Sequence, residues 1–271
     1  MRALAVTSAD DPRIAEYRNV READLRLRDG LFLAEGRLNV KRLITGSPYR
    51  TRSVLVTGTA LQAIRAALAR LADDTPVYVG SQALLADVVG YAMHRGCLAA
   101  GERGAEPDLR SLLGRAPRTL VVLEDVSNPE NVGSVFRNAL ALGADGVVLT
   151  RRCVDPLYRR SIRVSMGASL RLPYARVDDG AAGLDALRAA GFTNVALVAA
   201  HGAAPLAREC YVPQRIALWL GSEGDGLSEG VLAQIERRVT IPMATGADSL
   251  NVATASAIAL HHYRALAERG S

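Results

Sequence analysis

Three polar, glycine-containing segments of the chain could carry chemistry, and the first spans residues 124–138 (EDVSNPENVGSVFRN). Pro129 suits a turn, and Asn131 could cap the helix that follows. Gly133 would let a second backbone approach closely, and Arg137 falls roughly on the same helical face. An arginine there could bind an anionic group. An ordinary capped helix with one surface arginine is the alternative for this segment taken alone.

The second segment, residues 220–230 (LGSEGDGLSEG), would expose backbone groups to a ligand, because Gly221, Gly224 and Gly226 directly follow an apolar run. Their GxxGxG spacing is neither the dinucleotide fingerprint GxGxxG nor a phosphate loop ending in GK[ST]. Glu223 lies inside the loop, where a carboxylate would repel a phosphate. The segment therefore favours a ligand with hydroxyl groups or a positive charge. A mobile surface turn is the alternative.

The third segment, residues 241–255 (IPMATGADSLNVATA), joins an apolar run to a helical pattern. Pro242 stops the strand, Asp248 or Ser249 could cap the helix, and Asn251 would lie in its first turn. Free amides at a helix start are potential binding groups. If the strands before the second and third segments are neighbours, these groups converge on one site.

The elements that would position these segments alternate regularly through the second half of the chain. Apolar strands that alternate with helices indicate a parallel sheet covered on both faces. Ligands bind beyond the carboxyl ends of such strands, where all three segments fall. The predicted strands are 119–125, 145–150, 172–177, 194–200, 215–221 and 239–243, with Trp219 in the core; the predicted helices are 131–144, 157–168, 183–191, 228–237 and 249–269.

The first half predicts a smaller α/β unit. Its strands are 52–58 and 76–81, and its helices are 13–28, 60–72 and 84–94. Residues 101–117 mix glycine, proline and charge, as linkers do. We therefore expect a first domain over 1–100, a linker over 101–117 and a second domain over 118–271.

Charge and cysteine content narrow the class of protein. The 271 residues carry a net charge of +5, and the segments 13–52 and 151–171 are each strongly basic. Such segments suit a nucleic-acid backbone, or they form solvated faces. The three cysteines form no CxxC pair, which argues against a disulfide framework and against a cysteine-based zinc site; we expect no metal. Without a signal-like or membrane-spanning apolar run, a cytoplasmic protein is expected.

The three segments, in this order, resemble the motifs of the SpoU family, the TrmH-type RNA ribose 2′-O-methyltransferases of the SPOUT superfamily. The resemblance covers about 118–271 and rests on NxGxxxRN at 131–138, LGSEGDGLS at 220–228 and IPMATGADSLNVATA at 241–255. The first half is similar to the ribosomal-protein-like α/β substrate-binding domain often fused ahead of this catalytic domain. That likeness lies in 32–44, 76–81 and 90–99, with His94-Arg95-Gly96 where His-Gln-Gly is more usual.

The resemblance implies a fold, a cofactor and a site. The fold is a parallel-sheet domain with a deep trefoil knot, and the protein would be a homodimer through this C-terminal domain. S-adenosylmethionine would be the cofactor. Carried over residue by residue, the cofactor-binding set is Ala200, Gly221, Ile241, Met243 and Leu250, and the catalytic set is Asn131, Arg137, Glu223, Ser249 and Asn251.

Roles within the catalytic set follow partly from chemistry. The family proposal makes Arg137 the base, but guanidinium groups stay protonated in proteins. We expect Arg137 to clamp a phosphate and stabilise the forming alkoxide instead. Ser249 and Asn251 would orient the 2′-hydroxyl, and Glu223 would position Asn131 or Arg137. His201, after strand 194–200, is an alternative base.

The predicted function is S-adenosylmethionine-dependent methylation of a ribose 2′-hydroxyl in structured RNA, with rRNA favoured over tRNA because of the extra first domain. With 4% aromatic residues, recognition would depend on basic grooves and RNA shape. Three alternatives remain: an antibiotic-resistance rRNA methyltransferase, a non-catalytic RNA-binding or ribosome-assembly protein on the same fold, and a nicotinamide-dependent oxidoreductase, which would lack its early glycine fingerprint.

Overall fold

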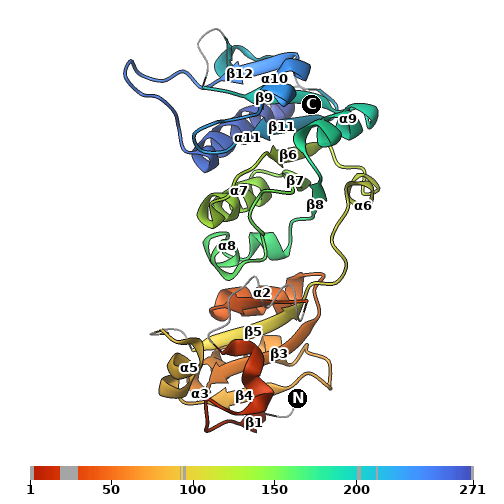
Figure 1. The fold of residues 1–271 in the computed structure, drawn as a ribbon. Coiled ribbons are helices and arrows are strands. Elements are labelled where there is room, and N and C mark those ends of the chain that lie inside the picture. The colour runs from red at the N-terminus through yellow and green to blue at the C-terminus, as the bar shows by residue number, and fades with distance from the viewer. Residues whose placement is uncertain are drawn as a thin grey trace. The chain divides into compact units, whose positions relative to one another are not determined.

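A computed structural model of the chain describes residues 3–18, 30–91, 93, 96–199, 203–211 and 213–269 (Figure 1). The chain divides into two compact units: Met1–Ala105 with Pro156–Arg171, and Glu106–Asp155 with Leu172–Ser271. The predicted residues Ala200 and His201, and His94-Arg95, lie outside the described residues. So does most of the predicted helix 13–28, whose described part is the 3-10 helix η1 (Pro12–Tyr17) followed by Arg18.

The first unit is built on a mixed five-stranded sheet in the order β1-β4-β3-β5-β2. Neighbouring strands β1, β4 and β3 run parallel, and β5 runs antiparallel to both β3 and β2. The strands are β1 (Ala3–Ala5), β2 (Leu31–Glu35), β3 (Thr51–Thr57), β4 (Val77–Gly80) and β5 (Cys97–Glu102).

Side chains alternate between the two faces of this sheet, as the strand period of two requires. Phe32 and Val54 enter a core with α2 (Arg37–Gly46), α3 (Gly58–Ala63) and α4 (Arg65–Leu68), whereas Leu33 and Leu55 pack against η1 and α5 (Gln82–Val89). The predicted helix 60–72 is therefore divided, with a break at Ile64, and the predicted helix 84–94 ends at the left-handed Gly90.

A segment from the second half of the chain completes the first unit. It contains α8 (Arg159–Val164) and η2 (Ala168–Leu170), and its Leu157, Ile162 and Leu170 are at most 1% exposed within the core that contains Val40 of α2. The first unit is thus discontinuous along the chain, which the linear division at residues 100 and 118 did not anticipate. Between those positions, β5 extends to Glu102, and α6 (Leu109–Leu113) forms.

The second unit contains a seven-stranded sheet in the order β10-β12-β9-β11-β6-β7-β8, and every pair is parallel, as predicted. Helices α7 and α11 pack together on one face, while α6, α9 and α10 cover the other (Figure 1). The strands are β6 (Thr119–Leu123), β7 (Gly146–Thr150), β8 (Tyr174–Val177), β9 (Thr193–Leu197), β10 (Ala204–Pro205), β11 (Ile216–Leu220) and β12 (Arg237–Thr240); the helices are α7 (Pro129–Ala141), α9 (Gly180–Ala189), η3 (Leu206–Arg208), α10 (Glu229–Gln234) and α11 (Val252–Arg269).

The centre of this sheet is apolar and fully covered. Trp219 of β11 is 0% exposed, which confirms its predicted core position, and its indole Nε1 donates to Asn194 Oδ1 at 2.8 Å. A buried indole needs such a partner. In the part of the chain that the structure describes, no helix is both long enough and apolar enough to cross a membrane.

Replacing Ile162 tests whether the inserted segment is part of the first unit's core. Ile162→Ala removes a side chain that is 0% exposed, and we expect the free energy of unfolding to fall by about 2–5 kcal/mol. Urea denaturation followed by hydrogen exchange should show lost protection in β2 and β5. The control Ile258→Ala alters a side chain that is 39% exposed and should change little. Lost protection confined to β6 and β11 would contradict this assignment.

Candidate functional site

A cleft of about 1280 Å³ lies where the loops after β9, β11 and β12 meet. These three strands are neighbours in the sheet, so their carboxyl ends, and the loops that follow them, come together at one edge. Seven of the ten predicted site residues line this cleft: Gly221, Glu223, Ile241, Met243, Ser249, Leu250 and Asn251. Asn131 and Arg137, both on α7, are not among the residues that line it, and Ala200 is outside the described residues.

The loop after β11 folds back tightly on itself. Ser222 N donates to Gly226 O at 3.1 Å, and Gly226 N donates to Ser222 O at 3.2 Å. A Cβ added to Gly221 would lie 1.9 Å from the carbonyl carbon of Gly226, and Gly224 adopts φ 120°. Glycine is therefore required at Gly221 by close backbone packing and at Gly224 by conformation. Residues 220–227 of this loop all line the cleft.

Asn131 links the three motif segments. Its side-chain amide donates to a carboxylate oxygen of Glu223, in the loop after β11. Its Oδ1 accepts from Asn251 Nδ2 at 2.9 Å. Asn131 is only 7% exposed, so its amide depends on these two hydrogen bonds, although Glu223 and Asn251 are themselves exposed. The expectation that Glu223 and Asn131 lie together agrees with this geometry.

Both predicted helix caps were wrong by a few residues. Asn251 caps α11, because its Oδ1 accepts from Ala253 N at 2.9 Å; neither Asp248 nor Ser249 has this role. Asn128 caps α7 by accepting from Glu130 N at 2.8 Å, with Pro129 at the first helical position. Proline suits that position, since its missing N–H would be unpaired there anyway. Asn131 thereby lies in the first turn of α7 and is free to join the motif segments.

Arg137 and Ser249 have no such commitments. Arg137 is exposed on α7, and neither its guanidinium nor the Ser249 hydroxyl makes a side-chain hydrogen bond or ion pair within the described residues. The next residue of α7, Asn138, donates to Ala253 O at 2.7 Å and so joins α7 to α11. Arg137 is therefore available to an anionic ligand, carried on a helix that is anchored beside it.

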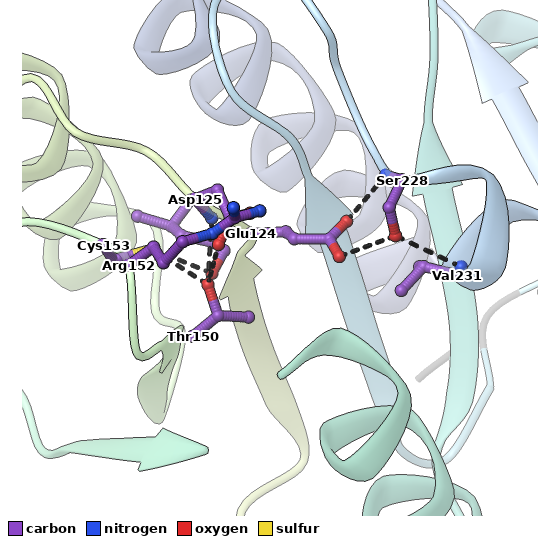
Figure 2. Close-up of polar contacts among 8 residues, drawn as sticks. Glu124, Asp125, Thr150, Arg152, Cys153, Ser228 and Val231 are labelled. Atoms are coloured by element: carbon purple, nitrogen blue, oxygen red, sulfur yellow. Dashed lines mark hydrogen bonds and ion pairs between the residues drawn. The ribbon is translucent and has the colours of Figure 1, made fainter. Parts of the chain in front are cut away.

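Sequence reasoning missed Glu124, which directly follows β6. Figure 2 shows its carboxylate meeting Ser228 at the end of the loop after β11: it accepts from Ser228 N at 2.9 Å and from Ser228 Oγ at 2.8 Å. Ser228 Oγ in turn accepts from Val231 N at 3.3 Å, capping α10. Glu124 is 5% exposed, and a Cβ on Gly180 would lie 2.5 Å from it. Glu124 thus anchors the carboxyl end of the cleft loop.

The next residue, Asp125, ties the ends of β6 and β7 together. It adopts φ 58°, and its N–H donates to Thr150 Oγ1 at 2.9 Å while its Oδ1 accepts from the same hydroxyl at 2.7 Å (Figure 2). Partial burial alone would raise the pKa of the Asp125 carboxyl, but hydrogen bonds from Arg152 and Thr150 outweigh it and lower the pKa. The carboxylate therefore remains charged and holds this strained backbone.

Comparison with known proteins agrees with this architecture. A model of the SpoU rRNA methylase family matches residues 118–261. The chain is 41% identical over 268 residues to an uncharacterized tRNA/rRNA methyltransferase of Mycobacterium bovis, covering 94% of this chain and 90% of that one. The chain therefore belongs to the SpoU rRNA methylase family and is an RNA methyltransferase, which confirms the resemblance.

Two solved structures extend the comparison. An AdoMet-bound rRNA methyltransferase from Sinorhizobium meliloti superposes with a TM-score of 0.80 at 25% identity, covering 97% of this chain and 98% of that one. A structure reported for the 2-OH methylation of C/U34 on tRNA matches with a TM-score of 0.51 at 31% identity, covering 56% of this chain and 99% of that one. The first likeness includes both units, and the second spans about half of this chain.

Replacing Glu124 tests its anchoring of the loop. Glu124→Ala removes a carboxylate that is 5% exposed and accepts from two Ser228 donors, and we expect the free energy of unfolding to fall by about 1.5–3 kcal/mol. Glu124→Gln keeps one acceptor and should lose about half as much. Urea denaturation measures both, and hydrogen exchange should show faster exchange at 221–228. The control Glu229→Gln changes an exposed carboxylate in the first turn of α10, the helix that Ser228 caps. If both Glu124 variants matched this control, the anchoring assignment would be wrong.

Proposed function

We propose that this RNA methyltransferase transfers a methyl group from S-adenosylmethionine to the 2′-hydroxyl of a ribose in rRNA. The observation that carries the proposal is the hydrogen-bonded connection Glu223–Asn131–Asn251 at the rim of the cleft. It joins three segments that are distant along the chain, and each contributes residues of types suited to methyl transfer. The knotted threading of the C-terminal segment and a homodimer through the second unit are part of the same proposal.

The cleft has the chemical character that the cofactor requires. The charged residues that line it are one arginine, Arg238, and four carboxylates: Glu223, Asp225, Glu236 and Asp248. This excess of negative charge favours a cationic sulfonium over an anionic ligand. Three of the loop residues that line the cleft are glycines, so their backbone groups are not screened by side chains and could hydrogen-bond a ligand. Gly221, Ile241, Met243 and Leu250 would hold the cofactor, with Ala200 near them. When bound, S-adenosylmethionine supplies an electrophilic methyl group.

The protein's part of the reaction is to align the ribose hydroxyl and to ease loss of its proton. Alignment of two reactants can lower a barrier by about 7–11 kcal/mol. Arg137, exposed and uncommitted, clamps a substrate phosphate and stabilises the forming alkoxide. The Ser249 hydroxyl orients the 2′-hydroxyl. Asn251 already donates to Asn131 and caps α11, so we assign it chiefly to holding the Ser249 segment in place.

The extent of structural similarity favours rRNA over tRNA. The Sinorhizobium meliloti rRNA methyltransferase resembles this chain over 97% of its length, so the likeness includes the first unit. The structure reported for tRNA methylation matches 56% of the chain. In this proposal the unit containing the first hundred residues binds RNA, and residues 118–271 supply the cleft.

Mapping the methylated atom tests this function. Purified protein is incubated with labelled S-adenosylmethionine and either total rRNA or total tRNA from a strain that lacks the gene. Nuclease digestion and mass spectrometry should then locate the label on a ribose oxygen in rRNA. Label on a base atom would refute the reaction type. Label in tRNA alone would refute the rRNA assignment.

A matched pair of glycine variants tests whether the cofactor binds at the loop after β11. Gly221→Ala places a methyl group against the Gly226 backbone, so cofactor binding measured by calorimetry should weaken at least about tenfold. In contrast, nothing lies within 4 Å of a Cβ added to Gly230. Gly230→Ala should therefore bind the cofactor as the parent protein does.

Arg137→Lys tests the phosphate clamp. Lysine keeps the charge but loses the planar, bidentate geometry of guanidinium. We expect kcat to fall by about 10²–10³-fold, while the affinity for S-adenosylmethionine stays unchanged. Single-turnover methylation and calorimetry measure the two quantities. Arg110→Lys, on the exposed side of α6, is the control. Near-normal turnover of Arg137→Lys with unchanged RNA binding would exclude the clamp.

A further inference from the structure

The structure brings together parts of the two basic segments that are far apart in sequence. Helix α2 belongs to 13–52, and α8 with η2 belongs to 151–171; all three elements lie in the first unit. Sequence alone left these segments as either nucleic-acid contacts or separate solvated faces. Their arrangement within one compact unit allows a more specific inference.

Three observations show that α2 and the 156–171 segment are direct neighbours. The Arg42 guanidinium donates to the Met166 carbonyl. A Cβ on Gly167 would lie 3.1 Å from Arg42 Cδ and 3.1 Å from Asn39 Oδ1. Val40 and Leu43 of α2 also share one core with Ile162 and Leu170. Because these apolar faces point inward and the two elements touch, their exposed side chains belong to adjacent parts of the outer surface of the first unit.

This outer surface is basic and carries no acidic residue. Between them, α2 and residues 156–171 contain seven basic side chains and no Asp or Glu. We call the exposed part the α2–α8 surface; it consists of Arg37, Leu38, Lys41, Arg160, Arg163, Met166 and Arg171. Leu38 and Met166 are each 38% exposed, among the most exposed large apolar side chains of the described residues. The α2–α8 surface thus combines basic side chains with two exposed apolar ones.

Met166 is held in an unusual backbone conformation. Its φ is 51°, in the left-handed region that non-glycine residues rarely adopt, and Gly167 follows with φ 78°. The Arg42 contact to its carbonyl fixes this turn. Strained, over-determined residues cluster at binding and catalytic sites. Glycine would fit this backbone with less strain, so packing of the fold does not explain the exposed methionine.

We propose that the α2–α8 surface is a docking site for the RNA substrate, in which the basic side chains bind backbone phosphates and Leu38 and Met166 contact sugars or bases. The inference rests on the proposed function, since it takes RNA as the substrate. Phosphate contacts position a nucleic acid, and apolar side chains can insert at base steps. The low aromatic content leaves aliphatic side chains to provide such contacts.

The charge contribution is tested with Lys41→Gln/Arg163→Gln. Binding to a fluorescein-labelled RNA stem-loop is measured by anisotropy over a series of salt concentrations. We expect weaker binding, and the slope of log K against log salt should become shallower by about 1 for each lost phosphate contact. The control Arg65→Gln/Arg70→Gln removes the same charge from α4 and the turn after it, outside the α2–α8 surface. Equal losses in both variants would overturn the proposal.

Met166→Gly separates binding from folding. It removes an exposed side chain and relaxes the left-handed backbone, so the urea midpoint should stay the same or rise. RNA affinity should nevertheless fall severalfold. Met166→Leu keeps an apolar side chain and should restore most of the affinity. Unchanged RNA binding by Met166→Gly would remove the apolar part of the proposal.

Two further outcomes distinguish this inference from the proposed function. If the parent protein methylates no RNA, yet Lys41→Gln/Arg163→Gln still weakens stem-loop binding relative to the control, the docking site stands and the proposed function fails. If the parent protein methylates rRNA and the surface variants bind like the parent, the docking site fails alone. Competition by poly-glutamate as strong as by unlabelled RNA, at equal charge concentration, would also overturn the RNA assignment.

Discussion

Asn131 is buried, and its amide makes a hydrogen bond at each end to a segment more than ninety residues away in sequence. The nitrogen donates to Glu223, and the oxygen accepts from Asn251. A buried amide left without its partners costs about 1–3 kcal/mol. Separating either the loop after β11 or the start of α11 from α7 therefore carries an energetic penalty, because it would leave this amide without a partner. Asn251 also caps α11, so the same connection fixes where the final helix begins. The geometry of the cleft rim depends on this group of three side chains.

The sheet beneath supplies the positions that these side chains need. Strands β12, β9 and β11 are adjacent and parallel, so their following loops meet without long detours. At the next strand, Glu124 N donates to Leu220 O at 2.9 Å, and the Glu124 carboxylate holds Ser228. The loop between Leu220 and Ser228 is thus fixed at both ends by one residue of β6's carboxyl terminus. Rigid support of this kind is what a binding site on loops requires.

Much of the second unit could be predicted from sequence, because its strands are continuous apolar runs and its helices have clear periodicity. Convergence of the second and third motif segments was predicted on the condition that β11 and β12 are neighbours. In the structure β9 lies between these two strands, and the loops that follow them still line one cleft. The caps were not predictable, since Asn128 and Asn131, or Ser249 and Asn251, offer equivalent chemistry a few residues apart. Glu124 carried no spacing signal: a single acid after a strand is common, and its value comes from Ser228, over a hundred residues later. The placement of residues 156–171 depended on tertiary packing, which local patterns do not contain.

That placement constrains how the protein can fold. The chain passes between the two units after residues 105, 155 and 171, so the segment carrying α8 leaves the second unit after β7 and returns before β8. The core around Val40 lacks Leu157, Ile162 and Leu170 until residues up to 171 have been synthesised. By then β6, α7 and β7 have been synthesised, but β11, which pairs with β6, has not. The N-terminal unit therefore cannot complete its core ahead of the rest, as an uninterrupted leading domain would. The α2–α8 surface is complete only when the first part of the second unit has also been synthesised.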